Sequence, residues 1–184
     1  MFVITVGSSI YIGDDATFLC DGSSDEDEIS NAITLISERG GGIVQLTEGT
    51  YYMDGSINLA SNVILDLGRA IIEKNCNDYA IRGDGGSGSE LENITIQNGT
   101  ITRNAADTNA KDLIYLDYCD KVTIKNCNII DSYYHGIYCY YCDDLRIESC
   151  NLSTGVWDGM LIDGSDIVKI VNLSSLNKGG VAIR

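Results

Sequence analysis

The sequence predicts an all-β fold: a right-handed parallel β-helix, a solenoid with rungs of about 23 residues, with an N-terminal capping α-helix. Three observations lead to this prediction. Apolar residues recur every 23 positions, short segments alternate apolar and polar side chains, and the turns are rich in Asn, Asp and Gly. With 20 glycines and no proline, tight turns must be made by residues that tolerate unusual backbone angles. A unit of this size cannot bury its apolar face alone, whereas stacked units share a continuous core.

Residues 24–40, SDEDEISNAITLISERG, predict a helix that covers the first rung. Ser24 is the expected N-cap, and the acidic residues after it suit the positive end of the helix dipole. Gly40 supplies the C-terminal stop. One apolar stripe is formed by Ile29, Ala32, Ile33 and Ile36. A calcium loop is the alternative interpretation of DGSSDEDE, but it lacks the glycine and distal glutamate of an EF-hand, so no metal is expected.

Residues 41–60 supply short strands that enter the stack, and the repeat itself is clearest further on. The segments 120–129, 143–152 and 166–175 align without gaps, and a second strand-like piece, 135–139, aligns with 158–162. Interior columns are expected for Val122, Leu145 and Val168, for Ile124, Ile147 and Ile170, and for Ile137 and Met160. A β-sandwich with coincidental spacing is the alternative. Agreement between several independent columns favours the β-helix.

Polar residues form columns as well. Asn98, Asn126 and Asn172 share one repeat position, where inward asparagines would hydrogen-bond along the stack. Cys127 and Cys150 share another position, which suits small buried side chains. Seven cysteines cannot all pair within one chain. Disulfides between rungs are compatible with the spacing. Reduced thiols are favoured because the start of the chain does not read as a signal peptide.

Length, composition and net charge limit the domain organisation and the classes of binding partner. We expect one β-helix domain over residues 1–184, divided into an N-terminal strand and capping helix (1–40) and stacked rungs (41–184). The net charge of −15 would repel a nucleic-acid backbone, and no apolar run is long enough for membrane insertion. No cofactor is implied. The last residues, KGGVAIR, stop inside a strand copy, so we expect a longer protein, or a homo-oligomer or further domain that caps this rung.

Residues 20–68 contain an Asp-Gly pair, an acidic predicted helix with Ala32-Ile33, a GGG stop, EGTY, and then INLASNVIL. With these motifs the segment resembles the first part of the pectate-lyase-like (pectin-lyase-fold) superfamily of right-handed parallel β-helices. Members often carry proline in the segment that matches LTEGTY, and this chain has none. The resemblance implies the fold but leaves the activity open among pectate lyases, polygalacturonases, epimerases, phage tailspikes and proteins of unknown activity. It also suggests location on a virion or a cell surface.

One polar column predicts a catalytic site. Asp112, His135 and Asp158 each precede a core strand in successive rungs. With rungs about 4.8 Å apart, the two carboxylates lie roughly 9.6 Å apart, at the upper edge of the range for inverting glycosidases. Asp158 is the expected general acid and Asp112 the base, while His135 is expected to contact the transition state or the substrate. The column also resembles polygalacturonase motifs in WDGMLI and YHGIYC. It departs from them in order, in lacking a paired Asp-Asp, and in lacking the following Arg-x-Lys.

The sequence leaves open whether the chain is an enzyme. Asp117 and Asp163, two rungs apart with Tyr140 between them, would make only a sparse calcium site, so hydrolysis is favoured over lyase chemistry. The leading hypothesis is a polysaccharide- or oligosaccharide-recognising protein of a phage tail or cell surface, with glycosidase activity left open. The residues expected to contact substrate are Tyr133, Tyr134, Tyr138, Tyr140, Trp157 and Asp163. The alternative is a structural β-helix shaft without a ligand, in which these aromatic side chains pack on neighbouring rungs.

Overall fold

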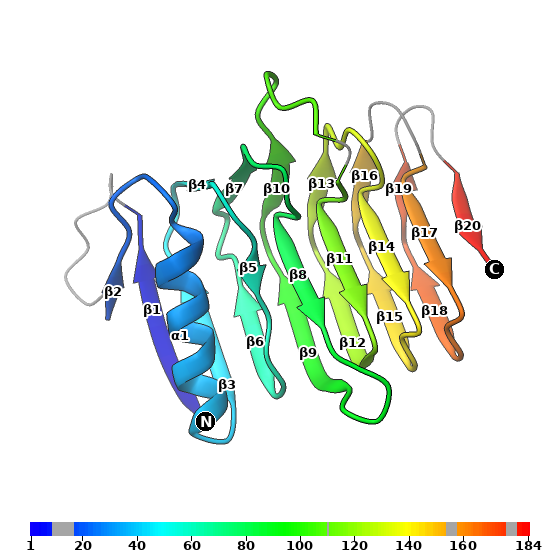
Figure 1. Ribbon diagram of the computed structural model, residues 1–184, viewed down its shortest axis with the longest axis horizontal. Helices are drawn as coiled ribbons and strands as arrows, with labels where there is room; N and C mark the ends of the chain where they lie inside the picture. Colours follow the sequence, from blue (N-terminus) through cyan, green and yellow to red (C-terminus); the bar gives the residue numbers. More distant parts are fainter. Residues whose placement is uncertain (9–16, 110, 154–157, 176–179) are drawn as a thin grey trace.

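The computed structural model describes residues 1–8, 17–109, 111–153, 158–175 and 180–184, which coil into three parallel sheets (Figure 1). In order across the sheet, sheet A contains β18 (Val168–Val171), β15 (Leu145–Glu148), β12 (Cys119–Lys125), β9 (Leu91–Gln97), β6 (Val63–Asp66), β3 (Gly42–Leu46), β1 (Phe2–Gly7) and β2 (Phe18–Leu19). Sheet B contains β19 (Ser174–Ser175), β16 (Asn151–Ser153), β13 (Asn128–Ile130), β10 (Thr100–Arg103), β7 (Ile71–Lys74) and β4 (Thr50–Met53). Sheet C contains β20 (Val181–Ile183), β17 (Met160–Asp163), β14 (Ile137–Tyr140), β11 (Ile114–Asp117), β8 (Ile81–Asp84) and β5 (Ile57–Asn58).

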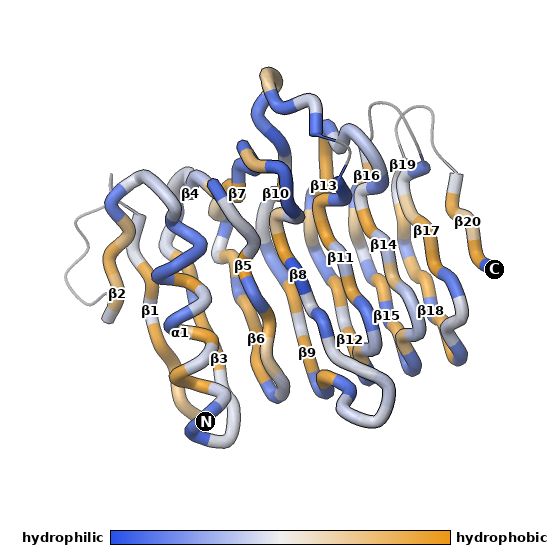
Figure 2. The backbone as a smooth tube through the Cα atoms, viewed as in Figure 1, coloured by the Kyte–Doolittle hydropathy of each residue, from blue (hydrophilic) through white to orange (hydrophobic). Residues whose placement is uncertain are grey.

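The predicted register is confirmed strand by strand. Ile124 pairs with Ile147 and Ile147 with Ile170, so the three side chains form one row along sheet A. On sheet C, Ile137 pairs with Met160, and both side chains are fully buried. Figure 2 shows the consequence, because hydrophobic and hydrophilic positions alternate along the strands and recur from rung to rung. The interior is one continuous apolar core that runs the length of the coil.

The helix α1 (Glu26–Glu38) packs against the first strands of all three sheets and so covers the N-terminal end of the coil (Figure 1). Its predicted apolar stripe is buried. The expected N-cap at Ser24 is wrong, because the helix begins one residue later with Asp25 in the capping position. The Asp25 carboxylate caps no helical N–H. It instead accepts hydrogen bonds from the backbone N–H groups of Gly22 and Tyr52, which tie the helix start to β4. Among the described residues, no helix has the length and apolarity needed to cross a membrane.

The asparagine column lies at a corner between sheets A and B, and its side chains do not face inward as expected. Asn126 and Asn172 are exposed, and Asn98 is half-buried. All three residues have positive φ angles, as does Ser149 in the same column. The position therefore selects for a left-handed backbone, which asparagine tolerates, rather than for burial. The ladder itself is present, since Asn126 Nδ2 donates to Asn98 Oδ1 at 3.2 Å and Asn98 Nδ2 donates to Asp66 at 3.0 Å.

All seven cysteines are free and buried. Cys127 and Cys150 stack on adjacent rungs, and the hydrogen bond with the Cys150 sulfur, together with burial, raises the pKa of the Cys127 thiol. Side chains in register on parallel strands are displaced by about one rung, near 4.8 Å. A disulfide needs β-carbons about 3.5–4.5 Å apart. The stacked arrangement therefore suits thiols that pack as small apolar groups.

Candidate functional site

The outer face of sheet C gathers the aromatic and acidic side chains singled out in the sequence. Alternation along β11 buries Ile114 and Leu116, and it turns Tyr115 and Asp117 outward. The same alternation on the neighbouring strands, in register, builds two outward columns. They are Arg82, Tyr115, Tyr138 and Leu161, and next to it Asp84, Asp117, Tyr140 and Asp163.

Four tyrosines form a row of ring contacts on this face. The ring of Tyr79, from the turn before β8, stacks on Tyr115 with centroids 4.3 Å apart and an interplanar angle of 14°. Tyr115 meets Tyr138 edge-on at 5.7 Å, and Tyr138 lies 6.2 Å from Tyr140. All four side chains are partly exposed. Lys111 Nζ lies 5.1 Å from the centre of the Tyr79 ring and adds a cation–π contact at one end of the row.

Two members of the predicted catalytic column, Asp112 and His135, are in direct contact. Asp112 Oδ1 lies 2.8 Å from His135 Nδ1 and also accepts the backbone N–H of His135 at 3.1 Å. Each residue is only 4% exposed. The His135 ring lies 5.6 Å from the Tyr138 ring, which places the pair beside the tyrosine row. A carboxylate held in this way orients the imidazole, a role that its burial fits better than proton exchange with a substrate.

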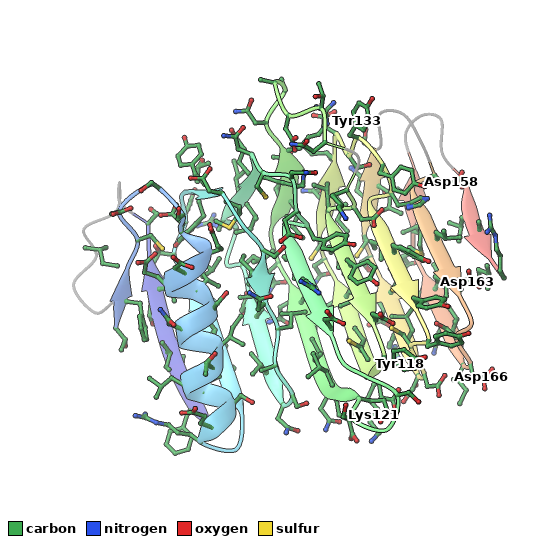
Figure 3. All side chains as sticks on the ribbon, in the orientation of Figure 1. Tyr118, Lys121, Tyr133, Asp158, Asp163 and Asp166 are labelled. Atoms are coloured by element: carbon green, nitrogen blue, oxygen red, sulfur yellow. The ribbon has the colours of Figure 1, made fainter. Side chains whose placement is uncertain are left out.

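The other predicted site residues are distributed along the same side of the coil. Asp158 is half-buried on the rung after His135, and Figure 3 places Asp158 and Asp163 at opposite ends of β17. Tyr133 packs beneath a guanidinium group, with Arg103 Cζ 5.6 Å from its ring centre. The Tyr134 ring lies 4.2 Å from the His135 ring. Trp157 lies outside the described residues.

Sequence reasoning missed Asp84 and Tyr79, and it did not connect Asp117 with either of them. Asp84 and Asp117 are register partners on adjacent strands, yet they are 33 positions apart in the chain. Insertions between these rungs break the 23-residue spacing, so an alignment without gaps does not find the pair. A detectable signal was the shared pattern of IRGD and IYLD, each a strand ending in aspartate. Burial and the nearby Asp84 carboxylate raise the pKa of Asp117 above its ordinary value.

A small acidic pocket adjoins the lower end of this face. Its cavity of about 220 Å³ is lined by Glu90, Tyr118, Asp120, Tyr141, Asp143, Gly164 and Asp166. The rings of Tyr118 and Tyr141 stack at 5.1 Å, and the ring of Tyr141 extends over Gly164, where an added Cβ would lie 2.6 Å from it. The negative charge of the sheet C face therefore continues around the corner toward sheet A.

A second cluster of potential ligand atoms lies under the capping helix. The side-chain donors of Cys20, Asp25 and Glu28 all lie within 4.8 Å of one another. Both carboxylate oxygens of Asp25 already accept backbone N–H groups. Burial and the neighbouring carboxylates raise the pKa of the Cys20 thiol, which disfavours the thiolate that a metal would need. These contacts give the cluster a structural role that requires no ion.

The family follows from a match to the sequence model described as "Right handed beta helix region", which covers residues 8–183. The chain belongs to the right-handed β-helix family. A solved structure of a candidate glycosyl hydrolase from Parabacteroides merdae is similar to this chain, with a TM-score of 0.72. It is 19% identical, and the match covers 85% of this chain and 83% of that one.

This β-helix chain is also similar to a tailspike protein of Escherichia coli bacteriophage HK620, solved in complex with a pentasaccharide. The TM-score is 0.53 at 15% identity, and the match covers 86% of this chain but 43% of the tailspike chain. At these identities the similarities describe the fold. No curated protein sequence matches the chain.

Proposed function

We propose that this β-helix protein binds a polysaccharide or oligosaccharide along the outer face of sheet C. The observation that carries the proposal is the row of partly exposed tyrosine rings formed by Tyr79, Tyr115, Tyr138 and Tyr140. Aromatic rings offer large, rigid apolar surfaces with a polar hydroxyl at the edge, which suits the apolar faces of sugar rings. Tyr79, Tyr115 and Tyr138 belong to successive rungs about 4.8 Å apart, so their rings can contact successive parts of an extended glycan.

The charge of the face narrows the class of glycan. Asp84, Asp117 and Asp163 lie in one column of this face, and the whole chain carries a net charge of −15. A polyanionic glycan such as polygalacturonate would be repelled at low salt. We therefore propose a neutral glycan or one that carries amino sugars. The similarity to a tailspike solved with a pentasaccharide supports an oligosaccharide ligand as a proposal for this chain.

Removing the central rings is expected to weaken glycan binding several-fold each. Tyr115→Ala and Tyr138→Ala each remove an aromatic contact worth about 0.5–1.5 kcal/mol beyond its buried area. The measurement is affinity electrophoresis followed by calorimetry on xylan, galactomannan, β-glucan and chitosan, with polygalacturonate as the acidic comparison. Tyr52→Ala is the matched control, because Tyr52 is a 39% exposed tyrosine on β4 of sheet B.

Two results would count against glycan recognition. One is the absence of binding to every polymer. The other is an equal loss of affinity in Tyr52→Ala and Tyr138→Ala. The remaining function is then the structural shaft, which the ring-to-ring packing of the tyrosines also permits, since each ring has part of its surface covered by a neighbour. Glycosidic cleavage by Asp112, His135 and Asp158 remains a prediction within this proposal, and reducing-sugar release by Asp158→Asn compared with the unmodified protein tests it.

A further inference from the structure

The carboxylates of Asp84 and Asp117 are neighbours on adjacent rungs. The two residues are register partners on the parallel strands β8 and β11, and both side chains leave the outer face of sheet C. Parallel strands lie about 4.8 Å apart, so two equivalent side chains project side by side at a similar separation. Retaining glycosidases hold their two carboxyl groups roughly 5–5.5 Å apart.

The environments of the two groups differ in the way that acid and nucleophile roles require. Asp84 is exposed and forms an ion pair with the guanidinium group of Arg82. Asp117 is half-buried, and its Oδ2 accepts a hydrogen bond from the Tyr115 hydroxyl at 3.2 Å. Its Oδ1 is buried without a hydrogen-bond partner among the described residues. Burial, followed by the Asp84 charge, raises the pKa of Asp117 and favours its protonated form.

We infer that Asp84 and Asp117 are the nucleophile and the general acid/base of a retaining glycosidase site on this face. The inference rests on the proposed function, because the tyrosine row that contains Tyr115 must hold the glycan across the pair. It differs from the sequence prediction, which placed cleavage at Asp112 and Asp158.

The reaction has two balanced steps. In the first, an Asp84 oxygen bonds to the anomeric carbon as the glycosidic C–O bond breaks, and the Asp117 proton passes to the departing oxygen. The products are a free sugar hydroxyl and a glycosyl ester on Asp84. In the second, water bonds to the anomeric carbon as the ester C–O bond breaks, and Asp117 takes one proton from the water. Both carboxyl groups return to their starting states, and the sugar keeps its anomeric configuration.

The stereochemistry separates this pair from the carboxylate pairs that lie two rungs apart. Asp117 and Asp163 lie two rungs apart, as do Asp112 and Asp158, which is roughly 9.6 Å. That separation admits a water molecule between the groups and gives inversion. Retention therefore distinguishes Asp84 and Asp117 from these two pairs, and the aspartate variants distinguish them from the adjacent carboxylates of the acidic pocket.

The experiment uses the whole chain and the polymers that it binds in the affinity measurement. Proton NMR of the first-formed reducing ends reports retention or inversion in the unmodified protein. Asp117→Asn and Asp84→Asn are each expected to lower the rate of reducing-end release by roughly 10²–10⁴-fold while leaving glycan affinity within a few-fold. Glu73→Gln is the control, because Glu73 is a half-buried carboxylate on sheet B whose Oε1 accepts a hydrogen bond from Asn104.

The outcomes separate this inference from the function on which it rests. Retention, together with loss of cleavage in both aspartate variants and unchanged cleavage in Glu73→Gln, supports the pair. Binding without cleavage overturns the pair but leaves glycan recognition intact. Cleavage with inversion, or cleavage that survives in Asp117→Asn, also overturns it. Absence of binding to every polymer removes both proposals together. Circular dichroism of each variant checks folding, and the anomer measurement needs no variant.

Discussion

Replacing Lys74 with methionine is expected to lower the free energy of unfolding by about 3–5 kcal/mol. Alternation along β7 turns Lys74 into the interior, where its Nζ donates to Asp107 Oδ2 at 2.5 Å and to the Cys76 carbonyl at 2.8 Å. Both charged side chains are 1% exposed. Methionine fills similar space but leaves the Asp107 carboxylate buried and unpaired, which costs more than the pair itself contributes.

Urea denaturation followed by circular dichroism measures this loss. Lys121→Met is the matched control, because Lys121 pairs with Glu92 at 3.2 Å on the surface, where the two side chains are 57% and 48% exposed. A change within about 1 kcal/mol is expected for it. The double variant Lys74→Met with Asp107→Asn should recover part of the loss, because the uncompensated charge is gone. Equal losses of unfolding free energy in the two lysine variants would contradict the expected cost of leaving the Asp107 carboxylate buried without its partner.

Replacing Ile147 with alanine is expected to cost about 2–5 kcal/mol. Ile147 is fully buried in the middle of the interior row, between Ile124 on β12 and Ile170 on β18. The variant loses the transfer free energy of three methyl or methylene groups and leaves a cavity that neighbouring rungs cannot close without shifting along the coil.

Because each rung contacts only its neighbours, this damage should weaken one end of the coil before the other. Hydrogen exchange is expected to accelerate first in β15 and β18, with β3 and β6 the last to change. Arg146→Ala on the same strand is the control, since Arg146 is exposed and a surface change there should stay within about 0.5 kcal/mol. Uniform acceleration along all rungs, or equal losses in the two variants, would contradict a nearest-neighbour coil.

Part of the candidate site could be predicted from the sequence, because part of it lies where the repeat is regular. Between Asp112 and Asp163 successive rungs keep the 23-residue spacing, so the column that joins Asp112 to His135 was predicted correctly as neighbours. In the column of Asp84, Asp117, Tyr140 and Asp163, the sequence connected the last three members but not the first. Its first member lies 33 positions before the second, and the extra residues form loops that leave the strand register unchanged.

The sequence by itself determined the coil: the apolar rows that face inward, the stacking of the rungs that keep the 23-residue spacing, and the position of the capping helix. It could do so because burial on a parallel strand demands period two, and stacking demands the same residue class one rung later. Only the tertiary structure decided the pairings made across that pattern, such as Lys74 with Asp107, Asp25 with the backbone of β4, and Asp84 beside Asp117. These pairings depend on loop lengths and side-chain directions, and a hydrogen bond or a charge pair leaves no periodic trace in the chain.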